Sequence, residues 1–253
     1  MEASNRAVLT AVVAAVVAAA AFVPEVGAVA HLGELPVIVA AVAMALVIAF
    51  GWPVLLGLPN LLGSRVVIAL GGVGAVIAVT GTRGQPYLRQ LPIVLALAVL
   101  LAFVNEFARQ DGRSRLVDSV AGTVSGVLVA TAAAGWVAVE RAPSGTSIAV
   151  SGAVALAVAA AVSAVPLGGL MGSAVTTGAA VLAGGSVGTV MPHLPPLAGV
   201  LLGLATGVLM AALHALFDRL PTLRRRPAAF AVIVLPVAMS GILVYVVGRV
   251  LVG

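Results

Sequence analysis

Two polar segments of this apolar chain hold most of the groups that could bind an anion. The segments run over residues 105–118 and 214–226, and their candidates are Arg109, Arg113, Arg115, Arg219, Arg224, Arg225 and Arg226. A guanidinium group binds phosphate through two parallel hydrogen bonds. If the two segments meet, we expect them to bind lipid phosphates, and anionic membrane lipids are therefore the expected ligands. The ordinary alternative is that these arginines only set topology and reach toward anionic headgroups.

A histidine and an aspartate form the second candidate pair. His214 and Asp218 are four residues apart, so both side chains fit on one face of a helix end. A carboxylate beside an imidazole raises its basicity and orients it, as a proton relay requires. The blander alternative is a histidine that caps the carbonyl groups of its own helix. Two ligands are too few for a metal site, so we expect no metal and no cofactor.

Other chemistry is absent from the sequence. The chain has no cysteine, which excludes thiolate catalysis and disulfides. It has no phosphate-binding loop, no zinc-protease motif, no serine-hydrolase motif and no dinucleotide-binding fingerprint. We therefore expect no catalytic residue. Ionisable residues are also absent from the middle of the apolar runs, where ion-coupled transporters usually keep them.

The composition identifies the environment in which these residues must be positioned. The chain of 253 residues is 62% hydrophobic and 8% charged, and its mean hydropathy is +1.24. Such a chain cannot cover a surface that faces water, so it is an integral membrane protein. We predict a single all-α transmembrane domain over residues 1–253 with no soluble domain. Its nine spans cover residues 7–24, 36–58, 64–81, 90–107, 117–139, 147–165, 169–190, 197–217 and 228–250.

The arginines also predict the orientation, because positively charged short loops stay in the cytoplasm. With the N-terminus in the cytoplasm, the internal arginines are Arg6, Arg65, Arg109, Arg113, Arg115, Arg219, Arg224, Arg225 and Arg226, and the external ones are Arg83, Arg89, Arg141 and Arg249. The basic charge therefore favours a membrane topology and not nucleic-acid binding. Because all basic side chains besides histidine are arginine, we expect a GC-rich bacterial source and the inner membrane. Alternatively, residues 1–30 are a cleaved signal peptide, which leaves eight spans.

Glycines at four-residue spacing predict close helix packing. These glycines are Gly122 and Gly126, Gly168 and Gly172, and Gly199, Gly203 and Gly207. Small residues let helix backbones approach closely in lipid, either within one chain or between two copies. The span over 169–190 is so rich in glycine, serine and threonine that we expect it inside the bundle. Its glycines could alternatively break the helix and line a substrate cavity.

Two fragments resemble the CDP-diacylglycerol synthases, which are membrane phosphatidate cytidylyltransferases. Residues 115–126, where Arg115 leads into a small-residue helix, are similar to the mid-chain segment of that family. Phe217-Asp218-Arg219-Leu220, before the last span, is similar to its C-terminal Asp-Arg element. The resemblance implies a lipid enzyme in which Asp218 and Arg219 would belong to the site. The lysines and most carboxylates of the family's metal and nucleotide site are missing, so the resemblance implies a relative without synthase activity.

These observations favour a non-catalytic accessory or scaffold component linked to envelope lipid handling. It would contact anionic lipids and either a membrane protein partner or a second copy of itself. A transporter or lipid flippase that uses the span over 169–190 is the first alternative. A divergent lipid-headgroup transferase is the second, and it requires carboxylates gathered around Asp218.

Overall fold

The computed structural model describes residues 3–26, 29–109, 115–217 and 225–252. This part of the chain is helical and contains no strand. The helices are α1 (Ala3–Phe22), α2 (Leu35–Leu55), α3 (Leu61–Gly81), α4 (Leu91–Phe107), α5 (Leu116–Ala132), α6 (Ala134–Glu140), α7 (Gly145–Ser163), α8 (Gly169–Val190), α9 (Pro196–Phe217) and α10 (Arg226–Val252). Two 3-10 turns, η1 (Val23–Glu25) and η2 (Ala30–Leu32), connect α1 to α2.

The described helices agree in number with the nine predicted spans when α5 and α6 are counted as one segment. Eight helical segments are long and apolar enough to span a membrane when α5 and α6 are taken together, and α4 is a shorter apolar helix of 17 residues. Ala133 joins α5 to α6 with helical backbone angles, so the two helices make one crossing. The predicted all-α polytopic bundle is therefore confirmed. The largest difference in a helix boundary is at α1, which begins at Ala3 and not at residue 7.

Successive crossings alternate in direction, which places the loops at two ends of the bundle. We call one of them the basic end. It holds the first residues of α1, α3, α5, α8 and α10, and the described arginines Arg6, Arg65, Arg109, Arg115, Arg225 and Arg226. The opposite end holds Arg83, Arg89, Arg141 and Arg249. The described arginines divide between the two ends as the predicted topology divides them between two sides. Which end faces the cytoplasm stays a prediction.

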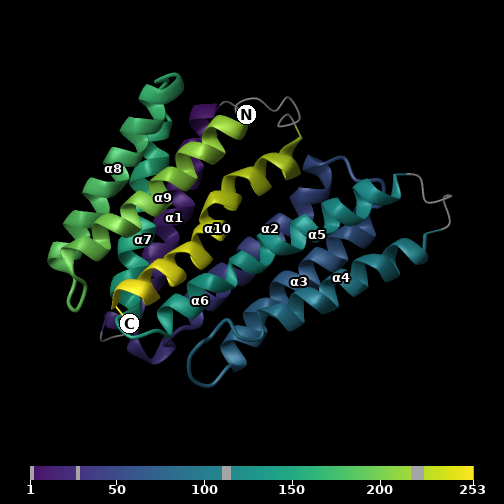
Figure 1. Ribbon diagram of the computed structural model, residues 1–253, viewed down its shortest axis with the longest axis horizontal. Coiled ribbons are helices and arrows are strands. Elements are labelled where there is room, and N and C mark those ends of the chain that lie inside the picture. The colour runs from purple at the N-terminus through teal and green to yellow at the C-terminus, as the bar shows by residue number, and fades with distance from the viewer. Residues whose placement is uncertain (1–2, 27–28, 110–114, 218–224, 253) are drawn as a thin grey trace.

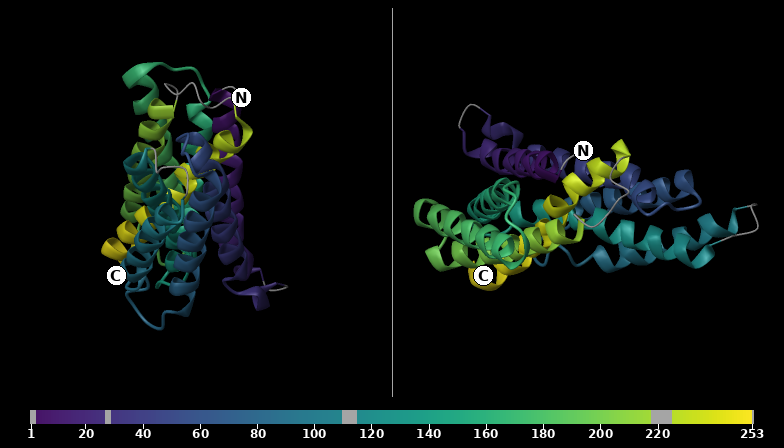
Figure 2. Two further views of the ribbon diagram at one scale, coloured as in Figure 1. Left: turned by 90° about the vertical axis from the view of Figure 1, so that its right-hand side faces the viewer. Right: turned by 90° about the horizontal axis from the view of Figure 1, so that it is seen from above.

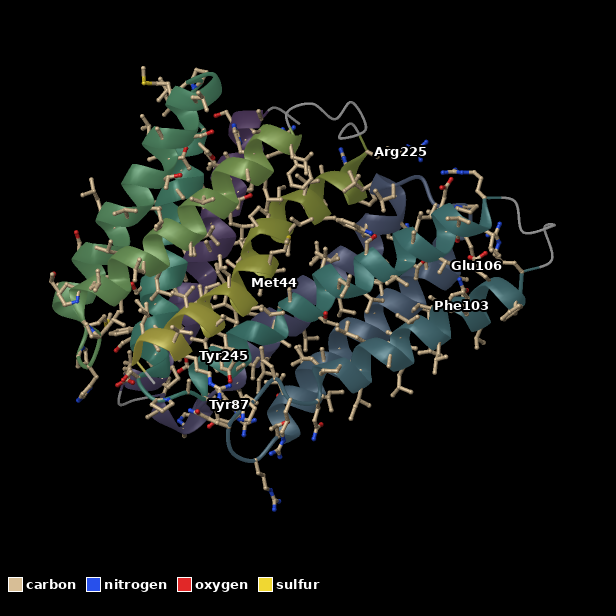
Figure 3. All side chains as sticks on the ribbon, in the orientation of Figure 1. Met44, Tyr87, Phe103, Glu106, Arg225 and Tyr245 are labelled. Carbon is tan, nitrogen blue, oxygen red and sulfur yellow. The ribbon has the colours of Figure 1, made fainter. Side chains whose placement is uncertain are left out.

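The helices form two groups that meet at α10. One group contains α1, α7, α8 and α9, and the other contains α2, α3, α4 and α5. Figure 1 shows α10 running between the two groups, and Figure 2 shows the same bundle from two further sides. Met44 of α2, labelled in Figure 3, belongs to the buried core that these helices share. Because α10 contacts helices of both groups, it holds them in one bundle.

Side chains of neighbouring helices bind the backbone of α10 close to Pro236. Proline lacks the N–H that would bond one turn back, so it interrupts the hydrogen bonds of the helix. The Thr10 hydroxyl donates to the Ile233 carbonyl oxygen at 2.9 Å, and the Trp136 indole N–H donates to the Val237 carbonyl oxygen at 2.7 Å. These bonds tie α1 and α6 to α10 on either side of Pro236.

The expectation that the span over 169–190 lies inside the bundle is wrong. Only 17% of its most apolar window is buried, and Leu170, Leu182 and Val190 are more than 70% exposed. This span is α8, which lies at the edge of the molecule in Figure 1. Its polar groups tolerate this position because the Ser186 hydroxyl donates to the Leu182 carbonyl oxygen, and the Thr189 hydroxyl to the Ser186 carbonyl oxygen, within the helix.

Candidate functional site

A hollow of about 480 Å³ lies at the basic end, between α7, α8 and α9. Its lining comes from the end of α7, the turn that follows, the start of α8 and the last turns of α9. The lining residues are Val162, Ser163, Val165, Leu167, Gly168, Gly169, Leu170, Gly172, Ser173, Thr176, Ala211, His214 and Ala215. Thr176 is seven residues from the start of α8, so the hollow reaches about 10 Å inward from the helix ends.

Small residues explain why this space stays open. Toward the opposite end, α8 and α9 are in backbone contact, because Gly199 and Gly203 approach the carbonyl groups of Gly184 and Ala180. The last glycine of this face, Gly207, contacts Thr177. Beyond it the facing positions are Gly172 on α8 and Ala211 and Ala215 on α9, whose side chains are too small to fill the gap. The glycine face of α9 therefore packs α8 along one half and leaves the hollow at the other.

The hollow has polar groups in an apolar frame. The Ser163 hydroxyl donates to the Ala160 carbonyl oxygen at 2.8 Å, and the Ser173 hydroxyl donates to the Gly169 carbonyl oxygen at 3.4 Å. Their oxygen atoms remain acceptors. No side chain caps the N-terminus of α8, which forms part of the wall and favours negative charge. The exposed Leu170 stands at the rim. This combination suits a molecule with a polar head and apolar chains.

His214, a residue of the predicted pair, lies between two hollows. It lines the one described above and a smaller one between α1, α9 and α10, which is also lined by Arg6 and Thr10. His214 in both hollows and Arg6 in the smaller one are the basic residues of the described lining, which contains no carboxylate. Asp218, the predicted partner of His214, lies outside the described residues.

The predicted arginine cluster does not form a single site among the residues that the structure describes. Arg225 and Arg226 are exposed at the start of α10, whereas Arg109 and Arg115 belong to α4 and α5. Figure 3 shows Arg225 well apart from Glu106, the partner of Arg109. Arg113, Arg219 and Arg224 lie outside the described residues.

Arg115 is held by its own surroundings at the basic end. Its guanidinium pairs with the exposed Asp118 carboxylate at 3.0 Å and donates to the Gly57 carbonyl oxygen at 3.1 Å. It therefore ties α5 to the connection between α2 and α3.

A buried ion pair at the end of α4 was not predicted. The Arg109 guanidinium donates to the Glu106 carboxylate at 2.6 Å, and both side chains are at most 5% exposed. The second carboxylate oxygen accepts a short hydrogen bond from the Ser119 hydroxyl of α5. Glu106 therefore joins α4 to α5. Glu106 and Arg109 are three positions apart, which is a helical spacing, but the sequence does not indicate that the pair is buried.

Two asparagines extend this polar region toward α3. The Asn60 carboxamide oxygen caps α3 by accepting from the Gly63 N–H at 3.0 Å, and its NH₂ group donates to the Asn105 carboxamide oxygen at 3.1 Å. The other side-chain polar atom of Asn105, Nδ2, is buried without a hydrogen-bond partner. Since Gly63 lies directly against Asn105, a side chain there would collide with it. The first turn of α3 is thus packed closely against the last turns of α4.

The other predicted packing glycines behave in two ways. Gly122 lies against Leu58, and Gly126 lies against Ile68 and Trp52, so this face of α5 packs on α2 and α3. Gly168 faces open space. Gly172 approaches the carbonyl group of the preceding turn and not a neighbouring helix. The second pair therefore shapes the hollow and does not pack helices together.

At the opposite end, Arg141 joins several elements. Its guanidinium donates to the carbonyl oxygens of Val79 and Thr80 at the end of α3, pairs with Glu34 at 3.6 Å, and lies 5.3 Å from the centre of the Tyr87 ring. Figure 3 shows Tyr87 beside Tyr245 of α10, whose hydroxyl accepts from the Tyr87 backbone N–H at 3.3 Å. Arg141 therefore connects the end of α6 to α3, to Glu34 and to Tyr87.

Metal binding has no support among the described residues, which contain no group of three or more His, Asp or Glu side chains arranged to hold an ion. Glu25, His31, Glu34 and His193, at the end opposite the basic end, form no such group either.

No family model, no curated protein and no solved structure matches this chain. The resemblance to CDP-diacylglycerol synthases therefore stays a prediction. Its first fragment forms the start of α5, and most of the second lies outside the described residues.

Proposed function

We propose that the protein is a non-catalytic membrane component that binds the headgroup of an anionic lipid in the hollow between α7, α8 and α9. The observation that carries this proposal is the hollow itself, which lies between the ends of three membrane helices and is not fully enclosed. Space at this depth is reached by lipid headgroups, and its polar groups are surrounded by apolar residues. We place it in the cytoplasmic leaflet of a bacterial inner membrane, in agreement with the arginine distribution.

The charges favour an anion over a cation. His214 and Arg6 are the ionisable groups in the described walls of the two adjoining hollows, and the N-terminus of α8 adds a partial positive charge. A lipid phosphate accepts hydrogen bonds from imidazole, guanidinium and backbone N–H groups. The acyl chains would extend past Leu170 into the bilayer.

Native mass spectrometry of the protein in nanodiscs of phosphatidylglycerol and phosphatidylethanolamine tests this proposal. We expect the protein to retain phosphatidylglycerol, and Ala215→Phe to abolish retention by filling the hollow. The matched control is Ala212→Phe, an exposed position on the same helix outside the lining. The proposal is wrong if the two variants retain phosphatidylglycerol equally.

Lipid transport is the second candidate, and the hollow also favours it because it lies at one end of the bundle and is not fully enclosed. Vesicles containing the protein and a fluorescent phosphatidylglycerol distinguish the two. A reductant added outside destroys about half of the signal if the lipid stays in its leaflet, and nearly all of it if the protein moves lipid across. Loss of this activity in Ala215→Phe but not Ala212→Phe would establish transport through the hollow.

A further inference from the structure

A second, apolar groove opens between α1 and α2 at the opposite end of the bundle. Its volume is about 640 Å³, and its lining includes Val16, Ala19, Val23, Leu35 and Ala43. Ala43 is eight residues from the start of α2, so the groove extends about 12 Å along the helix. It therefore lies within the apolar part of the membrane, far from the hollow at the basic end.

The groove exists because two consecutive helices pack against different neighbours. α1 packs mainly on α7, whereas α2 packs on α10 and α3. The turns η1, which contains Pro24, and η2 lie between them in the chain, and these turns project from the bundle in both views of Figure 2. Small residues such as Ala19 and Ala43 face the gap from both helices. In a membrane such a gap is filled by hydrocarbon.

The mouth of the groove is acidic. Glu34 directly precedes the lining residue Leu35, and Glu25 is two positions after the lining residue Val23. Both carboxylates lie within electrostatic reach of Glu140. One arginine, Arg141, pairs with Glu34 and is also bound to the end of α3. The neighbouring His31 is exposed. Among the described ion pairs, Arg141 neutralises Glu34 but not Glu25 or Glu140, so negative charge remains near this end of the groove, where a lipid headgroup would lie.

We propose that this groove binds one acyl chain of a lipid whose headgroup carries a protonated amine, with Glu25 and Glu34 contacting the amine. The apolar lining selects a hydrocarbon chain, and the acidic mouth selects a cationic group over phosphatidylglycerol. The site is separate from the anion site at the basic end, because the two share no lining residue.

Phosphatidylethanolamine is the probe, and its retention by the full chain is measured by native mass spectrometry in nanodiscs of phosphatidylethanolamine and phosphatidylglycerol. Ala19→Phe fills the groove and should remove bound phosphatidylethanolamine without reducing phosphatidylglycerol. The matched control is Ala15→Phe, an exposed position one turn away on α1 and outside the lining. Glu25→Gln should weaken phosphatidylethanolamine binding about tenfold through loss of a charge-assisted contact. Asp118→Asn, which removes a carboxylate at the basic end, should leave it unchanged.

Several outcomes would overturn this proposal. Equal phosphatidylethanolamine retention by the two phenylalanine variants would show that the groove is not the site. If Ala19→Phe loses phosphatidylglycerol instead, the groove binds an anionic lipid and not an amine lipid. If a second polypeptide occupies the groove, the ligand is not a lipid. The hollow is tested by Ala215→Phe and phosphatidylglycerol, so failure of one proposal is distinguishable from failure of the other.

Discussion

The carboxylate of Glu106 and the guanidinium of Arg109 form an ion pair at 2.6 Å that is almost completely buried at the end of α4. A second pair with the same three-residue spacing, Arg115 and Asp118, lies at the same end of the bundle with both side chains more than half exposed. Burial is the main difference between the two pairs. They therefore form a natural comparison for the energetics of charge in this protein.

Glu106→Gln should lower the free energy of unfolding by about 3 kcal/mol, because it removes the negative charge that faces a buried guanidinium. Asp118→Asn removes an exposed partner and should cost less than about 1 kcal/mol. Denaturation of both variants in the same detergent measures the difference. Equal losses would contradict the burial of the Glu106 pair.

Gly203→Leu should destabilise the bundle by about 1–3 kcal/mol, because its side chain would collide with the backbone of α8 at Ala180. Gly178→Leu places the same side chain on α8 where a Cβ meets open space, so it should be tolerated. Thermal unfolding in detergent provides the comparison. An unaffected Gly203→Leu variant would refute the contact between α8 and α9.

Arg141→Lys should cost about 1–3 kcal/mol although it keeps the charge. An ammonium group cannot reproduce the planar guanidinium that reaches the carbonyl groups of α3 and lies beside the Tyr87 ring. Arg83→Lys changes an exposed arginine at the same end and is the control. If both lysine variants unfold at the same temperature, the contacts of Arg141 do not stabilise the fold.

Replacing Arg224, Arg225 and Arg226 with glutamine should produce a mixed orientation, because it removes positive charge from one short loop. The chain has no cysteine, so single cysteines report the topology directly. Ser4→Cys at the basic end and His31→Cys at the opposite end should react from opposite sides of the membrane. In the glutamine variant, each should become partly accessible from both sides. Unchanged labelling would show that these arginines do not determine orientation.

The spans could be predicted because lipid requires long apolar helices, and charged residues such as Arg89 and Arg141 lie just outside them. The contacts between helices could not be predicted in the same way. Apolar residues are suitable both for the core and for lipid, so the sequence does not show which face of a helix turns inward. The expectation for α8 failed for this reason: a single stripe from Thr176 to Gly188 is buried, and the remaining small residues face outward.

The candidate site was predicted in part. His214 was singled out, but its place in the wall of a hollow depends on how α7, α8 and α9 pack together, which the sequence does not show. The glycine face of α9 was also recognised from its spacing. The sequence does not show that this face packs on α8, nor that a gap follows Gly207. Both depend on which small side chains of α8 and α9 face each other. Glu106 was part of a segment noted for its charge, and nothing in that segment distinguishes a buried acid from a solvated one.

The shortness of α4 has a consequence for the surrounding lipid. Its 17 residues extend about 26 Å, whereas the hydrocarbon layer of a typical bilayer is about 30 Å thick. Its outer face carries Leu97, Leu100 and Val104, and the exposed Phe103 is labelled on this helix in Figure 3. A span that is too short draws the two lipid surfaces together. The bilayer should therefore be thinnest along α4, so that the protein imposes an uneven thickness on the membrane around it.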